Sequence, residues 1–170
     1  MNLKNLPAGD NLPNEINVVI EIPAQDQIKY ELDEETGALF VDRFLHTASA
    51  YPFNYGFVPS SHAEDGDPLD VIVLSEYPIV PMAAIKCKPL AILDMEDESG
   101  KDEKIVAVPL EKIDPVYGAY NSADDIPAAT KDKIKHFFET YKALEPNKWV
   151  KVKDWSGVEE AKKVIEKSCK

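Results

Sequence analysis

The chain has 170 residues, 44% of them hydrophobic and 29% charged, which suits one globular domain with a substantial core, so we expect a single domain over 1–170. Its 19 basic and 31 acidic residues give a net charge of −12, which argues against nucleic acid as the main partner. We find no apolar run long enough for a membrane span, no signal-peptide pattern and no CxxC pair, so we expect a cytoplasmic protein with no membrane partner.

The first two thirds of the chain predict short strands, because runs of β-branched and aliphatic residues alternate there with proline and glycine turns. The segments with this pattern are 18–22, 28–32, 38–44, 71–74, 84–93 and 104–108. The second and third segments predict a hairpin, since the loop between them contains Gly37 near its end. Many short strands at close spacing predict a closed or nearly closed antiparallel barrel.

The last third of the chain changes to a helical period. Apolar residues recur at helical spacing up to Pro146, at Ile134, Phe137, Phe138, Tyr141 and Leu144. A second helix is expected to start at Ser156, where Glu159 completes a capping box. Strands followed by helices indicate an α+β protein that is mainly β.

An acidic cluster stands directly before the apolar run 71–74. Asp65, Asp67 and Asp70 lie close together there, separated by Gly66 and by Pro68 with its neighbour Leu69. Close carboxylates repel one another unless a cation joins them, and a hard divalent ion such as Mg2+ takes oxygen ligands. Asp-Gly and Asp-Pro are also common turn residues, so this segment alone is compatible with a structural turn.

Several charged residues lie within otherwise apolar strand segments. Lys29 and Glu31 are two residues apart and therefore project from the same face of their strand. Arg43 lies on the next strand of the hairpin, and Glu21 interrupts the apolar run 18–22. Surface exposure explains any one of them, but the group as a whole predicts a shared polar pocket.

Three further segments carry polar groups. Tyr51 and Tyr55 each add a hydroxyl just before the acidic cluster, although such a dense aromatic segment often only builds core. The tip of the later hairpin holds many acidic residues, and spacing alone does not show which are ligands: Asp94, Glu96, Asp97, Glu98, Asp102 and Glu103. Tyr141 and Lys142 are expected on the first helix, with Tyr141 in its apolar stripe.

Carboxylates combined with Lys29, Arg43, Lys104 and Lys142 suit metal-assisted phosphoryl chemistry, in which metals neutralise charge and cations bind phosphate oxygens. The sequence contains no P-loop, no G-x-G-x-x-G and no G-x-S-x-G motif. The histidines His46, His62 and His136 are too dispersed for a zinc signature.

The residues together resemble the soluble family I inorganic pyrophosphatases of the compact prokaryotic type. The segment Asp65-Gly66-Asp67-Pro68-Leu69-Asp70-Val71 matches the signature of that family. The resemblance covers nearly the whole chain in order, through the segments 19–23, 29–31, 37–43, 51–56, 136–142 and 148–152.

The resemblance implies a five-stranded, closed, OB-like barrel with two principal helices packed outside, and Mg2+-dependent hydrolysis of pyrophosphate to two phosphates. It implies several Mg2+ ions per site, held by Glu21, Asp65, Asp70, Asp97 and Asp102. It implies Asp67 as general base for a metal-bridged water. The implied phosphate-binding residues are Lys29, Arg43, Tyr55, Lys104, Tyr141 and Lys142, with Glu31 and Tyr51 in support. It also implies a homohexamer, formed as a dimer of trimers.

Two alternatives follow from the same sequence. The barrel would also suit a non-catalytic OB-type module that binds oligonucleotides or sugars, although the net charge of −12 speaks against it. A plain divalent-metal-binding protein would leave Lys29, Arg43 and Lys142 unexplained.

Overall fold

A computed structural model describes residues 6–33, 35–64 and 66–169 of the chain. The strands are β1 (Ile16–Ile22), β2 (Ile28–Leu32), β3 (Leu39–Phe44), β4 (Asn54–Phe57), β5 (Asp70–Val73), β6 (Ala84–Asp97), β7 (Gly100–Lys101), β8 (Lys104–Pro109) and β9 (Val150–Ser156). The helices are α1 (Ala128–Thr140) and α2 (Val158–Ser168), with short 3-10 turns η2 (Tyr117–Ala119) and η3 (Ala123–Asp125).

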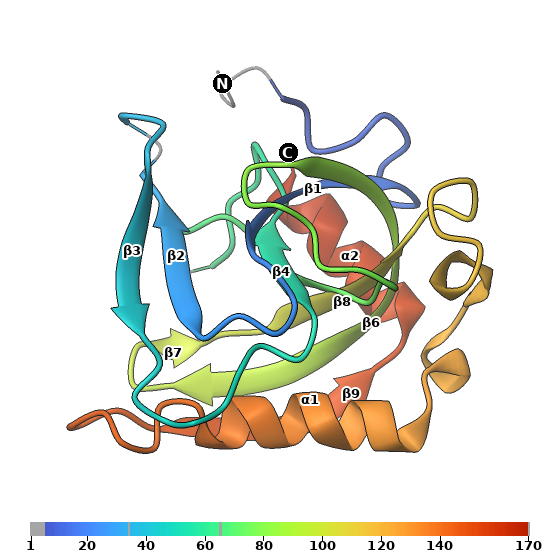
Figure 1. Ribbon diagram of the computed structural model, residues 1–170. Helices are drawn as coiled ribbons and strands as arrows, with labels where there is room; N and C mark the ends of the chain where they lie inside the picture. Colours follow the sequence, from blue (N-terminus) through green and yellow to red (C-terminus); the bar gives the residue numbers. More distant parts are fainter. Residues whose placement is uncertain (1–5, 34, 65, 170) are drawn as a thin grey trace.

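Five strands close into a ring (Figure 1). Their order is β1-β4-β5-β8-β6, and β6 pairs back with β1. The pairings are antiparallel except for the parallel pair β5–β8. β7 and β9 extend the sheet from β6, whereas β2 and β3 form a separate two-stranded sheet beside the barrel. The predicted α+β architecture with a five-stranded OB-like closed barrel is therefore confirmed.

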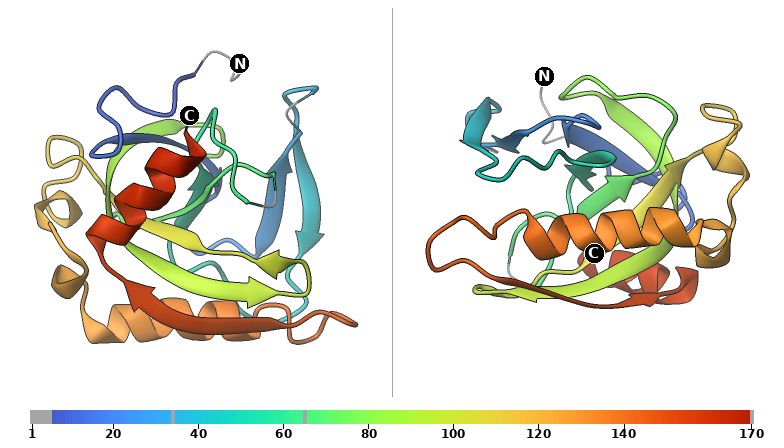
Figure 2. Two further views of the ribbon diagram at one scale, coloured as in Figure 1. Left: turned by 180° about the vertical axis from the view of Figure 1, so that it is seen from behind. Right: turned by 60° about the horizontal axis from the view of Figure 1, so that its bottom comes forward.

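Alternate residues of the barrel strands pack into two hydrophobic clusters, which explains why the strands are apolar on both faces. In β5, Val71 and Val73 join the cluster that contains Ala161 and Ile165 of α2. Ile72, between them, joins the cluster that contains side chains of α1. The two helices lie outside the ring, with α1 along one side and α2 across the back (Figures 1 and 2).

The long strand β6 bends around the ring at two irregularities. The register with β8 shifts between Pro89 and Ala91, and the register with β9 shifts between Leu93 and Met95. A proline donates no backbone hydrogen bond, so a bulge is one of the few places where a strand tolerates it. These shifts let one strand pair with β1, β8, β7 and β9 in turn.

Two predicted helix boundaries are wrong. α1 ends at Thr140, and the side chain of Leu144 is 65% exposed because residues 141–145 form turns instead of continuing the helix. Ser156 does not cap α2: it ends β9, its hydroxyl donates to Asp94 Oδ2 at 2.9 Å, and Gly157 is the N-cap. No helix in the described part of the chain is long and apolar enough to cross a membrane.

Candidate active site

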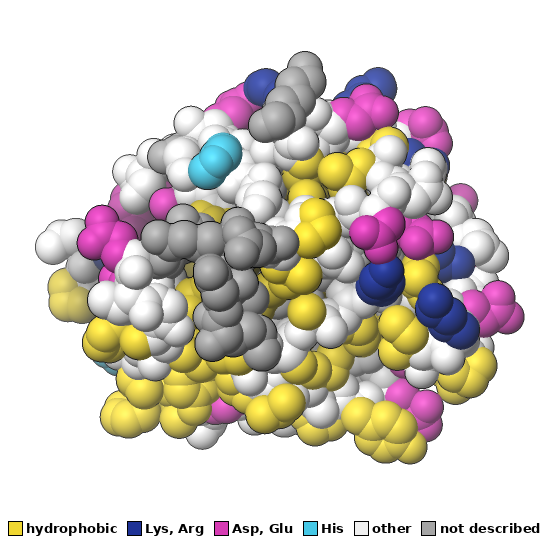
Figure 3. Space-filling view, turned by 90° about the horizontal axis from the view of Figure 1, so that it is seen from above, with side chains coloured by type: hydrophobic (Ala, Val, Ile, Leu, Met, Phe, Trp, Pro, Cys, Tyr) yellow, Lys and Arg dark blue, Asp and Glu magenta, His cyan; other side chains and the backbone are white. Residues whose placement is uncertain are grey.

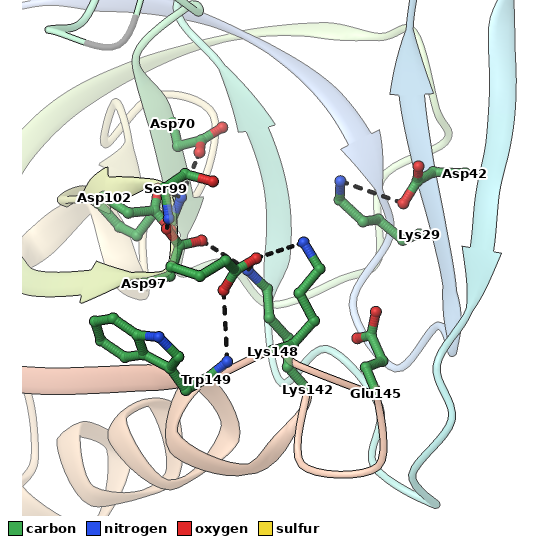
Figure 4. A network of polar contacts seen from close by, with 12 residues as sticks. Lys29, Asp42, Asp70, Asp97, Ser99, Asp102, Lys142, Glu145, Lys148 and Trp149 are labelled. Atoms are coloured by element: carbon green, nitrogen blue, oxygen red, sulfur yellow. Dashed lines mark hydrogen bonds and ion pairs between the residues drawn. The ribbon is translucent and has the colours of Figure 1, made fainter.

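A pocket of about 480 Å³ opens between the β2–β3 hairpin, the barrel and the segment that follows α1. Apart from Asp65 and Tyr51, every residue that the sequence predicted for the site lines this pocket. These lining residues are Glu21, Lys29, Glu31, Arg43, Tyr55, Asp67, Asp70, Asp97, Asp102, Lys104, Tyr141 and Lys142. Asp65 lies outside the described residues. Residues from widely separated parts of the chain thus meet at one place, and the close-up in Figure 4 shows the charged groups around it.

The acidic segment is held at the start of β5 by its own backbone. Leu69 is buried, its N–H donates to Ser61 Oγ at 2.9 Å, and its carbonyl accepts from Val58 N at 2.9 Å. The carbonyl of Asp67 accepts from Ala63 N at 2.7 Å. Gly66 has φ +96°, a conformation that side chains rarely adopt, so the glycine is required by the turn. This anchoring brings Asp67 and Asp70 to the pocket.

Lys104, the first residue of β8, joins two predicted metal ligands. Its side chain is buried, and its ammonium donates to Asp70 Oδ2 and, at 2.5 Å, to Asp102 Oδ1. Burial disfavours the charge of Lys104, but the two carboxylates outweigh burial and raise the pKa of the ammonium. The ammonium also lies over the Tyr55 ring, 5.7 Å from its centroid. Lys104 therefore remains charged in the pocket.

A second group of ion pairs connects the tip of the β6–β7 hairpin to the segment after α1 (Figure 4). Lys142 Nζ lies 2.7 Å from Asp97 Oδ2 and 3.8 Å from Glu98 Oε1. Glu98 also accepts from Lys148 Nζ at 2.5 Å. Burial opposes the ionisation of Asp97 and Glu98. The lysines and backbone N–H groups together outweigh burial, so the pKa of Asp97 is lowered and that of Glu98 falls to about 2.

The β2–β3 hairpin supplies a third charged group. Lys29 and Arg43 are cross-strand partners, and Asp42 is the extra residue of a bulge beside them. Lys29 Nζ lies 3.4 Å from Asp42 Oδ2 and 3.5 Å from Glu31 Oε2, which confirms that Lys29 and Glu31 share a face. Arg43 Nη1 lies 2.6 Å from Asp42 Oδ2, and its Nε lies 3.1 Å from Glu145 Oε1.

Glu21 is the most deeply buried of the predicted ligand carboxylates that the structure describes. Only 9% of the residue is exposed, and its Oε1 accepts from Leu32 N at 2.8 Å. Burial raises the pKa of Glu21 to about 7, although the hydrogen bond from Leu32 and the charge of Lys29 oppose the shift. Glu21 is thus poised to change its protonation state, or to accept a cation, near neutral pH.

The tyrosines Tyr51, Tyr55 and Tyr141 form an aromatic wall beside the charged groups. Their rings are packed together, with Tyr51 5.5 Å from Tyr55 and 6.5 Å from Tyr141 between centroids. Burial raises the pKa of all three hydroxyls, so they remain protonated and are able to donate hydrogen bonds. Tyr51 is not among the described residues that line the pocket, but its ring packs against those of Tyr55 and Tyr141, which do.

The segment after α1 carries Tyr141 and Lys142 just beyond the helix on which they were expected. Tyr141 is the C-cap of α1 and packs against Phe137 and Phe138, as its place in the apolar stripe predicted. Lys142 lies in the turn that follows, so it extends from the helix end and not from a helix face.

Sequence reasoning missed several residues of the charged network. Glu98 was in the acidic tip, but nothing in its spacing separated it from its neighbours. Lys148 belongs to a basic and aromatic segment that was noted only as part of the family resemblance. Asp42 was likewise noted only within the resemblance segment 37–43, and Glu145 gave no signal; a bulge and a turn bring the two residues to Arg43.

The chemistry of the donor set fits a divalent metal. Carboxylate oxygens of Glu21, Asp67, Asp70, Asp97 and Asp102 line one pocket, and hard cations such as Mg2+ prefer these ligands. Among the described residues, no three acidic, histidine or cysteine side chains already converge as a metal site. Asp70 and Asp102 converge on Lys104 instead.

The comparisons with known proteins agree on one family. A family model described as inorganic pyrophosphatase matches residues 18–170. The inorganic pyrophosphatase of Aquifex pyrophilus is 53% identical over 167 residues, which cover 98% of this chain and 94% of that protein. A solved inorganic pyrophosphatase from Coxiella burnetii is 51% identical with a TM-score of 0.93, covering 96% of this chain and 98% of that one. One from Helicobacter pylori is also 51% identical, with a TM-score of 0.93, over 97% and 96% of the two chains. This chain belongs to the inorganic pyrophosphatase family.

Proposed function

We propose that this protein hydrolyses inorganic pyrophosphate to two phosphates in a Mg2+-dependent reaction. The observation that carries the proposal is the mixture of charges around one pocket. Lys29, Arg43, Lys104 and Lys142 are suited to bind phosphate oxygens, and the neighbouring carboxylates are suited to bind metal ions. Membership of a family whose relatives are named inorganic pyrophosphatases supports pyrophosphate as the substrate.

The carboxylates divide into two proposed groups of metal ligands. Asp65, Asp70 and Asp102 would hold the tightest ion, and Asp70 would also bind a second. Asp97, Asp102 and Glu21 would hold ions that arrive with the substrate. When bound, Mg2+ neutralises phosphate charge and lowers the pKa of a coordinated water.

Asp67 is the proposed general base, because its side chain lines the pocket beside the proposed ligands. In the reaction, the oxygen of a water molecule bonds to one phosphorus, and the bond from that phosphorus to the bridging oxygen breaks. The proton of the water passes to the Asp67 carboxylate, and the leaving phosphate keeps the electron pair of the broken bond. A base in this position contributes about 10²- to 10⁴-fold in rate.

The remaining residues bind and orient the phosphates. Lys29 and Arg43 approach from the hairpin, whereas Lys104 and Lys142 approach from the barrel and the segment after α1. These fixed positive charges stabilise the charge that develops on the leaving phosphate. Tyr55 and Tyr141 remain protonated and donate neutral hydrogen bonds, and Glu31 supports Lys29 at 3.5 Å.

The same proposal includes a cytoplasmic homohexamer, formed as a dimer of trimers, with no nucleic-acid partner. The net charge of −12 supports the absence of a nucleic-acid partner. Exposed hydrophobic side chains support self-association: Phe44 is 65% exposed and Tyr77 is 70% exposed. In Figure 3, hydrophobic side chains gather along one edge of the face shown, and charged side chains occupy other parts of it.

The test is to measure phosphate release from pyrophosphate with Mg2+ and with a chelator in its place. We expect turnover with Mg2+ and its loss when the metal is removed. Folded protein that shows no turnover with any divalent ion would refute the proposal. In that case, salt-sensitive binding of single-stranded oligonucleotides would favour the non-catalytic OB-type module.

A further inference from the structure

Glu145 is a buried carboxylate that the proposed mechanism does not use. It lies in the turn after α1, where its N–H donates to Lys142 O at 2.9 Å, and its side chain is only 9% exposed. It is not among the described residues that line the pocket. Its Oε1 lies 3.1 Å from Arg43 Nε, and its Oε2 has no hydrogen-bond partner within the described part of the chain.

Burial of a carboxylate with one oxygen unpaired costs free energy, because the water lost from that oxygen is not replaced. A neutral residue at this position would avoid that cost. Glu145 forms an ion pair with Arg43, and this contact links the segment after α1 to β3, far away in the sequence. In Figure 4, Glu145 extends from the segment after α1 toward the hairpin.

The guanidinium of Arg43 has a carboxylate beside two of its nitrogens. Nη1 donates a hydrogen bond to Asp42 Oδ2 at 2.6 Å, whereas Nε lies 3.1 Å from Glu145 Oε1 in an ion pair that is not a hydrogen bond. A guanidinium that is hydrogen-bonded at one nitrogen and attracted to a second carboxylate at another is restricted in its orientation. Arg43 itself lines the pocket. An arginine whose orientation is restricted by these two carboxylates has less freedom to lose when a phosphate binds.

We propose that Glu145 is a positioning residue that orients the Arg43 guanidinium toward a phosphate group of the substrate. The inference rests on the proposed function, in which Arg43 binds phosphate oxygens. Glu145 acts from outside the pocket and does not contact the substrate.

Two effects of Glu145 on substrate binding have opposite signs. The negative charge of Glu145 repels an anionic substrate, so if charge alone mattered, removing it would strengthen binding. If Glu145 orients Arg43, removing it would weaken binding, because the freed guanidinium must be oriented again when the substrate binds. Glu145→Gln removes the charge at nearly constant shape. Glu145→Asp keeps the charge but shortens the side chain, so that it no longer reaches Nε.

The experiment compares KM and kcat for pyrophosphate in these two variants, in Arg43→Lys and in the double variant Glu145→Gln with Arg43→Lys. Glu139→Gln is the matched control, because Glu139 is an exposed glutamate on α1. The affinity for inorganic phosphate, measured by calorimetry, provides a readout that needs no turnover. Thermal midpoints report whether each variant is folded.

We expect both Glu145 variants to raise KM by about tenfold, to change kcat less, and to weaken phosphate binding by a similar factor. In the Arg43→Lys background, Glu145→Gln is expected to change KM by less than about twofold, because lysine has no fork to orient. Equal losses in both backgrounds, or tighter phosphate binding in Glu145→Gln, would overturn the inference. If the wild-type protein shows no turnover, the proposed function fails, and the phosphate affinities alone decide the role of Glu145.

Discussion

The ammonium of Lys142 lies 2.7 Å from Asp97 Oδ2, so a proposed phosphate-binding residue and a proposed metal ligand are partners of each other. The same relationship recurs between Lys104 and the carboxylates Asp70 and Asp102. The cations and carboxylates of the pocket therefore neutralise one another. A metal ion and a phosphate would separate these pairs, since each takes one member.

This pairing predicts that Asp97→Asn strengthens phosphate binding in the absence of divalent ions. The variant removes the negative charge of the side chain that is hydrogen-bonded to Lys142, so the ammonium attracts an anion more strongly. We expect a gain of a few-fold in affinity for inorganic phosphate, measured by calorimetry with a chelator present. Asp124→Asn, at an exposed position, serves as the control. Weaker phosphate binding by Asp97→Asn would contradict the idea that Asp97 and a phosphate compete for the ammonium of Lys142.

The assignment of Asp67 as base predicts that Asp67→Asn lowers kcat by about 10²-fold or more, because an amide accepts no proton from water. The thermal midpoint should stay close to that of the wild type, since the carbonyl of Asp67 keeps its hydrogen bond to Ala63. Steady-state phosphate release and a thermal scan check both statements, with Asp132→Asn on the surface of α1 as the control. A rate within a few-fold of the wild type would refute the assignment.

Lys104→Met should destabilise the protein most when metal is absent. The variant leaves Asp70 and Asp102 facing each other without the ammonium between them. We expect a loss of about 2 kcal/mol in the free energy of unfolding with a chelator, and a larger stabilisation by Mg2+ than in the wild type. Chemical denaturation with and without Mg2+ measures both quantities. Lys133→Met, at an exposed position of α1, is the control and should be stabilised by Mg2+ as much as the wild type is. If Mg2+ stabilises Lys104→Met no more than the wild type, the ammonium of Lys104 does not take the place of a metal ion between Asp70 and Asp102.

Glu21 predicts a pH-dependent stability in the absence of metal. Its carboxyl has a pKa of about 7 in the folded chain against 4.5 when unperturbed, so the unfolded chain releases this proton first as the pH rises. Ionisation therefore favours unfolding between about pH 4.5 and pH 7, and this residue lowers the free energy of unfolding by about 3 kcal/mol across that range.

The comparison of wild type with Glu21→Gln isolates this contribution. Denaturation at several pH values with a chelator should show the wild type losing stability relative to Glu21→Gln as the pH increases to 7. Glu139→Gln should follow the wild type, since that glutamate is exposed. Parallel pH profiles for the wild type and Glu21→Gln would show that the Glu21 carboxyl is not perturbed by burial.

The sequence predicted four of the five barrel strands, because β1, β5, β6 and β8 contain short apolar runs bounded by turn residues. It missed β4 of the barrel and β9, which extends the sheet from β6. β4 was interpreted only as a dense aromatic segment, since Gly56 is unfavourable in strands. The structure explains this glycine: a Cβ there would lie 1.9 Å from Val19 O, so the close pairing of β1 with β4 requires it. β9 does alternate, through Lys151 and Lys153, and that pattern would have revealed it.

The candidate site was predictable where residue type carries the chemistry, as in the acidic cluster and the cations of the strands. It was not predictable where geometry depends on irregular backbone. Lys142 reaches the pocket from a turn and not from a helix face, and the bulge that adds Asp42 to β3 has no local sequence signal. The proposed roles of all these residues remain predictions until the variants are measured.

The closure of the ring by β6 has a consequence for how the chain acquires its structure during synthesis. β1, β4 and β5 precede β6 in the sequence, and until residues 84–97 have emerged, β1 has no partner on its second side. β5 likewise waits for β8, at residues 104–109. A nascent or truncated chain that ends before residue 84 therefore exposes two unpaired strand edges at once, and such edges recruit other chains. Fragments of this kind should aggregate, whereas a chain that includes β8 is able to bury both edges within itself.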